Sequence, residues 1–387
     1  MKIGILTYHA QLNYGALLQC YALQTYLERL GHEVWIIDRW MSKENRMLKN
    51  YFRPMTFRKA FSYVYSLFCL NGLVPTMRRI DKTVAFQKKY LHLTPYHFYD
   101  WSELSEHTVD FDAIVVGSDQ VWNGNYSDPG PYLLENAPVD CRKIAYAASF
   151  GMREIPPPLK EKYKDGFERF DAISIRESSS RSFFTNCTKP IMSVLDPVFL
   201  LSREKWLKFA DLRPRSCRRT IFCYFIDIRH IEGIDSLEKF ARSHDYEINI
   251  FFNSFWFNVP VRFSLSHFLH QVRRRIHHLN FCLSDDPVEF VSALSRADGV
   301  ITDSFHGLMF SAIFEKNVRI LLPENDFHSQ AFARMEDFIV YSKSKDFFSA
   351  NVDTACSSLF SRHTEFSGEA LNRDIEKSKQ WLGNALR

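Results

Sequence analysis

Several features that often identify a protein's function are scarce in this sequence or missing from it. The chain of 387 residues has only 14 glycines. The loop after its first predicted strand, residues 7–15, contains one glycine where a dinucleotide-binding fingerprint has three. The eight cysteines form no C-x-x-C pair, and no His, Cys, Asp and Glu spacing resembles a metal site. We therefore expect a reduced protein that binds no NAD, FAD or metal and needs no cofactor.

The chain also lacks a large excess of positive or negative charge, and it lacks long apolar runs. A net charge of +4 is too small to indicate nucleic acid binding. The most apolar window, residues 60–74, is about 15 residues long, whereas a helix needs roughly 20 to cross a bilayer. Residues 1–6 resemble a strand and lack the apolar core of a signal peptide. These absences predict a cytoplasmic protein.

Aromatic side chains, in contrast, are abundant. They make up 15% of the chain, with 35 phenylalanines, and apolar residues reach 46%, which indicates a folded protein with a sizeable core. The length exceeds that of a usual single core, so we predict two domains, residues 1–200 and 201–387. The first domain would carry a basic, aromatic insert at about residues 41–100, and the second would end in a helix.

Short apolar runs followed by polar residues recur along the chain, as in α/β proteins. Strands are predicted at residues 2–6, 33–37, 112–116, 144–148, 172–175, 220–226, 248–252, 299–301 and 318–322, and helices at 16–30 and 305–313. Ligands of open α/β sheets bind beyond the carboxyl ends of the strands. The polar residues at those ends are therefore the candidate site.

The turn after residues 299–301 is the most informative of these strand ends. Asp303 or Ser304 is a suitable helix N-cap. His306 follows in the first helical turn, where free N–H groups and the helix dipole favour an anion. The alternative interpretation is that His306 only packs against or caps the helix.

Two further strand ends carry candidate groups. Arg176 follows residues 172–175 and suits a bidentate grip on a phosphate or carboxylate, although it could only form a surface ion pair with Glu177. Asp119 follows residues 112–116 and could accept a proton from a hydroxyl group or only cap a turn. His9, in the first loop, is expected to be solvated.

Six short blocks, in this order, resemble the motifs of the polysaccharide pyruvyl transferase family. They are Asn13-Tyr14-Gly15-Ala16 with Leu18-Gln19, Gly117-Ser118-Asp119-Gln120-Val121-Trp122-Asn123, Ala148-Ser149-Phe150-Gly151, Ser174-Ile175-Arg176-Glu177, Asp196-Pro197-Val198-Phe199 and Ser304-Phe305-His306-Gly307. The resemblance implies an α/β fold with two Rossmann-like domains facing across a cleft, in a GT-B-like arrangement. It also implies transfer of pyruvate from phosphoenolpyruvate to sugar hydroxyls as a ketal, during synthesis of capsular or other cell-surface polysaccharides.

The resemblance also implies the roles of individual residues. His306 and Asp119 would be the catalytic groups. The substrate-binding residues would be Arg176, Arg334, Asn13, Ser304, Trp122, Asn123 and Gln19. Trp122 is expected to stack on a pyranose ring. Ser304 departs from the family pattern, because members with a well-defined phosphoenolpyruvate site resemble Arg-Leu-His-Gly at this motif. Arg334 would then supply the missing charge.

The insert and the departure at Ser304 leave alternatives open. The basic and aromatic residues of the insert suit a polyprenyl-diphosphate-linked acceptor at the inner face of the plasma membrane, or a helical flap packed over the site. The chain could instead be a nucleotide-sugar glycosyltransferase of similar architecture. It could also be a non-catalytic saccharide-binding subunit of the assembly machinery.

Overall fold

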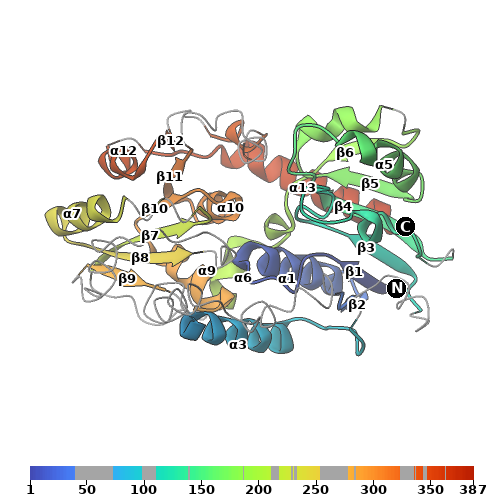
Figure 1. The fold of residues 1–387 in the computed structure, drawn as a ribbon, viewed down its shortest axis with the longest axis horizontal. Coiled ribbons are helices and arrows are strands. Elements are labelled where there is room, and N and C mark those ends of the chain that lie inside the picture. Colours follow the sequence, from blue (N-terminus) through green and yellow to red (C-terminus); the bar gives the residue numbers. More distant parts are fainter. Residues whose placement is uncertain are drawn as a thin grey trace, which may run out of the picture.

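The computed structural model describes residues 1–39, 73–97, 110–137, 140–185, 187–210, 218–227, 230, 233–252, 278–282, 285–322, 335, 337–342, 347–361 and 363–387. Arg334, most of the predicted insert and the aromatic segment 253–277 lie outside these residues. The described chain forms two parallel β-sheets of six strands each, with helices around both (Figure 1).

The first sheet is built from the N-terminal half of the chain. Its strands are Lys2–Leu6 (β1), Glu33–Ile36 (β2), Ala113–Val116 (β3), Arg142–Ala148 (β4), Ala172–Ile175 (β5) and Ile191–Ser193 (β6). They pair in the order β2-β1-β3-β4-β5-β6, and every pairing is parallel. The chain turns in opposite directions after β1 and β3, so the topological switch point lies between these two strands.

The second sheet repeats this plan. Its strands are Arg219–Phe225 (β7), Tyr246–Phe252 (β8), Leu279–Phe281 (β9), Gly299–Thr302 (β10), Asn317–Leu321 (β11) and Phe348–Ser349 (β12). The order β12-β11-β10-β7-β8-β9 places the second switch point between β7 and β10. Most of these strands are buried along their length, which explains why they read as continuous apolar runs in the sequence.

The helices cover the faces of the two sheets. They are Tyr14–Arg29 (α1), Leu73–Tyr90 (α3), Lys160–Phe167 (α5), Arg203–Phe209 (α6), Ile234–His244 (α7), Pro287–Arg296 (α9), Phe305–Ile313 (α10), Val352–Ser358 (α12) and Gly368–Ala385 (α13), with a short 3₁₀ helix at Pro197–Leu200 (η5). Several begin with the expected side-chain caps. Asp286 and Glu289, for example, form a reciprocal capping box at the start of α9.

The predicted fold class is confirmed: the chain is an α/β protein with two Rossmann-like domains in a GT-B-like arrangement. The expected strands and helices are present, with ends shifted by one or two residues. No helix among the described residues is both long enough and apolar enough to span a bilayer.

Three helices connect the two domains. In Figure 1, α13 runs from the second domain back to the first, where Leu382 joins the core and Arg142 donates a 2.6 Å hydrogen bond to the carbonyl of Ala385. Helix α3 lies along α1 and α9, and Lys82 forms a 2.6 Å ion pair with Glu289. Helix α1 belongs to the first domain, yet its Tyr14 packs into the core of the second domain. The domains therefore meet at the start of α1.

Candidate functional site

The turns that leave the two switch points meet at this interface. The turn from β1 into α1 is held by Asn13, whose side chain accepts hydrogen bonds of 2.9 and 3.3 Å from the backbone of Gly15 and Ala16. The turn from β10 into α10 is capped by Ser304, which accepts a 3.4 Å bond from Gly307. Ser304 thus uses its side chain to start the helix that carries His306.

Gly15 allows the two turns to approach closely. A Cβ atom at this position would overlap Nδ1 of His306, far inside van der Waals contact. His306 therefore packs directly on the backbone of α1 across the domain interface, with only 7% of its surface exposed. This contact explains why the glycine of the Asn13-Tyr14-Gly15 block belongs to the same site as the histidine.

Asp196 lies between the two predicted cationic residues of the site. Its Oδ2 atom is 3.0 Å from Nη1 of Arg176 and 3.6 Å from Nε2 of His306, and its side chain is fully buried. Burial alone would raise the pKa of this carboxyl. The charge and hydrogen-bonding capacity of His306, together with Arg176, outweigh that effect and lower the pKa to about 2. Asp196 is therefore ionised at neutral pH.

Arg176 is surrounded by acidic groups. Besides Asp196, Oδ1 of Asp119 lies 3.8 Å and Oε2 of Glu177 lies 3.9 Å from its guanidinium nitrogens, and the guanidinium stacks 4.4 Å from the centre of the Phe305 ring. Burial opposes the charge of Arg176, but the three carboxylates raise its pKa. The interpretation of Arg176 as a surface ion pair is wrong, because its side chain is only 3% exposed.

Several polar atoms of this cluster are buried without a hydrogen bond. Among the described residues, none bonds to Nε or Nη2 of Arg176, Oε2 of Glu177, or Nε2 of His306. Each such atom costs about 1–3 kcal/mol, so a folded protein rarely collects several in one place. Their concentration at the domain interface makes this region the candidate site for a polar ligand.

Asp119 and Gln19 hold the two switch-point loops of the first domain. Asp119 has a left-handed backbone with φ of 67°, and its Oδ1 accepts a 2.8 Å bond from the backbone of Gln120. It thus both caps its turn and faces Arg176. Gln19 donates to Thr7 Oγ1 at 2.9 Å and accepts from the backbone of Ser118 at 3.0 Å. Gln19 is fully buried and orients the loops.

The expectation that Trp122 stacks on a pyranose ring is wrong, whereas a substrate-binding role of Asn123 stays a prediction. Trp122 is fully buried, donates a 2.9 Å bond to the carbonyl of Tyr132 and packs among phenylalanine rings, so no face of the indole is available to a sugar. Asn123 is 1% exposed and donates a 2.9 Å bond to Gln120. The polar residues of this loop favoured an interpretation as a sugar-binding loop, but the loop folds back into the core beneath the site.

His9 is also placed differently from the prediction of a solvated residue. It is 1% exposed, and its Nε2 lies 2.8 Å from Oδ1 of Asp38. The other carboxylate oxygen of Asp38 lies 2.8 Å from Nδ1 of His97, whose side chain is 67% exposed. This His9–Asp38–His97 cluster stands at the carboxyl ends of β1 and β2. Sequence reasoning missed it, because His97 follows Asp38 by almost 60 residues.

Asp196 belongs to one of the family-like blocks, but the sequence analysis assigned it no role in the site. A signal for it was present, since Asp-Pro-Val is a typical start of a short helix, and the carboxylate does accept a 3.1 Å bond from the backbone of Val198. Its second oxygen is the one that joins Arg176 and His306.

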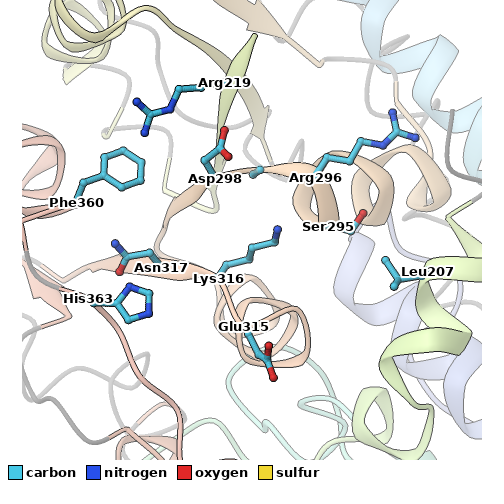
Figure 2. A pocket seen from close by; sticks show the side chains of 11 residues that line it. Leu207, Arg219, Ser295, Arg296, Asp298, Glu315, Lys316, Asn317, Phe360 and His363 are labelled. Atoms are coloured by element: carbon cyan, nitrogen blue, oxygen red, sulfur yellow. The ribbon is translucent and has the colours of Figure 1, made fainter. Parts of the chain in front are cut away.

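An open cleft of about 640 Å³ lies elsewhere, at the amino ends of the second sheet. Figure 2 shows that Arg219, Asp298 and Asn317 border it; these residues stand at the starts of β7, β10 and β11. Ligands of such sheets bind at the carboxyl ends, and the cleft contains none of the predicted site residues. We therefore locate the candidate site at the domain interface.

No group of three or more His, Cys, Asp or Glu side chains in the described part of the chain is arranged to hold a metal ion. The donor set at the interface, with a guanidinium next to the carboxylates, resembles an ion-pair cluster instead of a metal centre.

Comparisons with known proteins agree with this architecture. A model of the polysaccharide pyruvyl transferase family matches residues 13–325. The structure of UDP-N-acetylglucosamine 2-epimerase from Rickettsia bellii has 11% sequence identity and a TM-score of 0.53, covering 100% of this chain and 96% of that chain. UDP-GlcNAc 2-epimerase from Methanocaldococcus jannaschii, in complex with UDP-GlcNAc and UDP, has 11% identity and a TM-score of 0.52, covering 98% and 100%. At this identity the similarity shows the fold alone. No curated protein sequence matches the chain.

Proposed function

Because the chain belongs to the polysaccharide pyruvyl transferase family, we propose that it transfers pyruvate from phosphoenolpyruvate to hydroxyl groups of a saccharide, during synthesis of a cell-surface or capsular polysaccharide. The observation that best supports this function is the buried cluster at the domain interface, where His306 of the second domain meets Asp196 and Arg176 of the first. It combines an imidazole, a fixed carboxylate and guanidinium N–H groups that form no hydrogen bond within the described part of the chain.

The proposed reaction forms a ketal. A proton adds to the methylene carbon of phosphoenolpyruvate, and the neighbouring carbon becomes an oxocarbenium-like centre. One sugar hydroxyl attacks this centre, phosphate leaves with its bonding electrons, and a second hydroxyl completes the ketal. The two hydroxyls release two protons. One restores the general acid, which gave its proton to the methylene carbon, and the other leaves on the phosphate. No oxidant, reductant or metal is needed for this balance.

His306 is the proposed general acid. Its Nε2 atom lies 3.6 Å from Oδ2 of Asp196, whose carboxylate holds the imidazole in place at the domain interface. Asp119 is the proposed acceptor of a hydroxyl proton, because it stands at the end of β3 beside the same cluster. General acid or base catalysis contributes about 10²- to 10⁴-fold to a rate, so the loss of either group would be measurable.

The charge of the cluster limits how it could hold an anionic donor. Even with a protonated His306, its three carboxylates outnumber its two cations by one. Arg176 is therefore mainly a residue that positions Asp119 and Asp196, and its Nε and Nη2 atoms face carboxylates at 3.8–3.9 Å without forming a hydrogen bond. Additional positive charge is required, and Arg334 remains a proposed source.

The proposed acceptor is a saccharide, carried on a polyprenyl diphosphate at the inner face of the plasma membrane. The support is the basic and aromatic composition of residues 41–100. Sedimentation with anionic liposomes tests the membrane part of this proposal: we expect binding at low salt that weakens as salt increases. A protein that stays in the supernatant at low salt contradicts it.

Phosphate release from phosphoenolpyruvate, measured with several galactose-containing acceptors, tests the reaction. We expect turnover by the wild-type protein and a loss of about 10²-fold or more in His306→Ala. His92→Ala is a matched control, because His92 also pairs with a carboxylate, Glu28 at 2.9 Å, but on an exposed surface. Absence of turnover with every acceptor would favour a non-catalytic saccharide-binding role, whereas sugar transfer from a UDP-sugar would favour a glycosyltransferase.

A further inference from the structure

Tyr224 has a buried hydroxyl group that lacks a hydrogen bond. The residue is fully buried in β7, and none of the described residues provides a partner for its Oη atom. A buried tyrosine hydroxyl usually finds one, because leaving it unpaired is costly. The sequence offered no reason to select Tyr224, which lies within an apolar strand and outside every family-like block.

The position of Tyr224 in the fold is that of a ligand-binding residue. It is the second-last residue of β7, at the switch point of the second sheet, and it pairs with Thr302 of β10. The ring of Tyr14 packs on it with a centroid distance of 5.6 Å. Tyr14 directly precedes Gly15, on which His306 rests. Tyr224 thus joins the interface at which the other unpaired polar atoms are found.

The electrostatic surroundings of Tyr224 combine both domains. Burial raises the pKa of Tyr224, and Asp303 of the second domain and Asp119 of the first act in the same direction, whereas Arg79 acts against them. The hydroxyl therefore keeps its proton at neutral pH and can donate a hydrogen bond to an acceptor such as an anionic oxygen.

Arg79 supplies positive charge on the same side. This residue of α3 is 3% exposed, and its guanidinium lies 4.3 Å from the centre of the Tyr14 ring. It donates to the carbonyls of Leu12 and Phe252, and no carboxylate of the described residues lies within ion-pair distance of it. Buried charges are normally paired. A cation without a counter-ion beside Tyr224 therefore favours an anionic ligand.

From these observations we propose that Tyr224 donates a hydrogen bond to an anionic oxygen of the donor substrate, in the positive field of Arg79. This inference rests on the proposed function, because it takes the donor substrate to be an anion such as phosphoenolpyruvate. It accounts for the serine at position 304, since Tyr224 and Arg79 would provide contacts that an arginine in the motif would otherwise make. The hydroxyl is enclosed in the present conformation, so the ligand must displace the side chains packed on it.

The test compares Tyr224→Phe with a matched control, Tyr246→Phe. Tyr246 is also buried and its hydroxyl also lacks a hydrogen bond, but it begins β8 at the amino end of the strands, stacked 5.2 Å from Phe360. Both substitutions remove an unsatisfied group without changing shape, so neither should lower the melting temperature, and both are expected to fold. Only Tyr224→Phe is expected to alter binding.

Calorimetric titration with phosphoenolpyruvate, inorganic phosphate and UDP measures this effect. We expect Tyr224→Phe to weaken binding of the recognised anion about tenfold to a hundredfold, the usual range for a hydrogen bond to a charged group, with Tyr246→Phe unchanged. The inference is overturned if Tyr224→Phe binds within twofold of wild type, or if wild type binds none of these anions. If wild type binds UDP and not phosphoenolpyruvate, the proposed reaction fails, and the effect of Tyr224→Phe on UDP affinity still decides the inference.

Discussion

Nε2 of His306 lies 3.6 Å from Oδ2 of Asp196, across the interface between the two domains. The two residues are 110 positions apart in the sequence, and each stands at the start of a helix that follows a strand. Their pairing joins the segment that follows β6 of the first sheet to the switch point of the second sheet. Substitutions of the site residues, and of the residues that pack the two domains together, should therefore change activity and stability in different ways.

Asp196→Asn tests the charge at the centre of the site. The pKa of Asp196 is lowered to about 2 by His306 and Arg176 despite burial. Because the folded-state pKa lies below the unfolded value of about 3.9, the carboxylate contributes stability above pH 4 that is lost as pH falls towards 2. A shift of about two units corresponds to roughly 2–3 kcal/mol.

At pH 7 we expect the asparagine variant to be less stable than wild type by about 3–5 kcal/mol, since Arg176 loses a buried partner. Urea unfolding at a series of pH values measures the difference between the two proteins. This difference should shrink between about pH 4 and 2, and a constant difference over that range would contradict the assigned charge state.

Gly15→Ala tests the contact between the domains at His306. The added methyl group would overlap Nδ1 of His306, so the imidazole or the helix must move. Because displacements of about 1 Å can cost 10²-fold in rate, we expect activity to fall by at least that factor. Phosphate release from phosphoenolpyruvate is the measurement.

Gly383→Ala is the control for this substitution. Gly383 lies inside α13, where an added Cβ atom would meet no other atom within 4 Å. Alanine should therefore leave activity unchanged and stabilise the helix by up to about 1 kcal/mol. Equal activities of the two alanine variants would show that His306 does not need its present position.

Trp122→Ala distinguishes a core residue from a sugar-stacking one. Since the indole is fully buried among aromatic rings, its removal should cost about 3–5 kcal/mol of unfolding free energy. Trp122→Phe should retain most of this stability and leave the KM for the acceptor unchanged. Urea unfolding and acceptor titration measure the two effects. A large rise in KM with Trp122→Phe, at unchanged stability, would restore the sugar-stacking role.

Arg79→Lys tests the connection of α3 to both domains. The guanidinium donates to the carbonyl of Leu12 in the first domain and to that of Phe252 in the second, which a single ammonium group cannot reproduce. We expect a loss of about 1–3 kcal/mol and faster hydrogen exchange at the domain interface.

Lys82→Met, on the same helix, is the control for Arg79→Lys. The ion pair of Lys82 with Glu289 is about 40% exposed on both sides. Exposed ion pairs contribute about 0–1 kcal/mol to stability. The amide hydrogens at the domain interface of Lys82→Met should therefore exchange as fast as those of the wild-type protein. If Arg79→Lys behaves in the same way, the guanidinium does not hold the domains together.

Much of the fold could be predicted, because its signals are local. The apolar runs of β1 and β10 and the helical spacing of α1 and α10 can be read within a few residues of sequence, and so can the caps Asn13 and Ser304. Parallel sheets bury both faces of their strands, which makes these runs easy to recognise. The position of His306 at a strand end followed from the same pattern.

Only the tertiary structure decided which side chains meet. Trp122 was expected to stack on a sugar ring and His9 to be solvated, but both are buried, because the loops fold back onto the sheet. Asp196 lies in a family-like block but its contact with His306 of the other domain cannot be read from that block, and Tyr224 carries no local signal of function. The sequence by itself determined the strands, the helix starts and the histidine at the second switch point. The packing of α1 against the second domain determined the site, because contacts between distant segments depend on the whole fold and leave no periodic pattern in either segment.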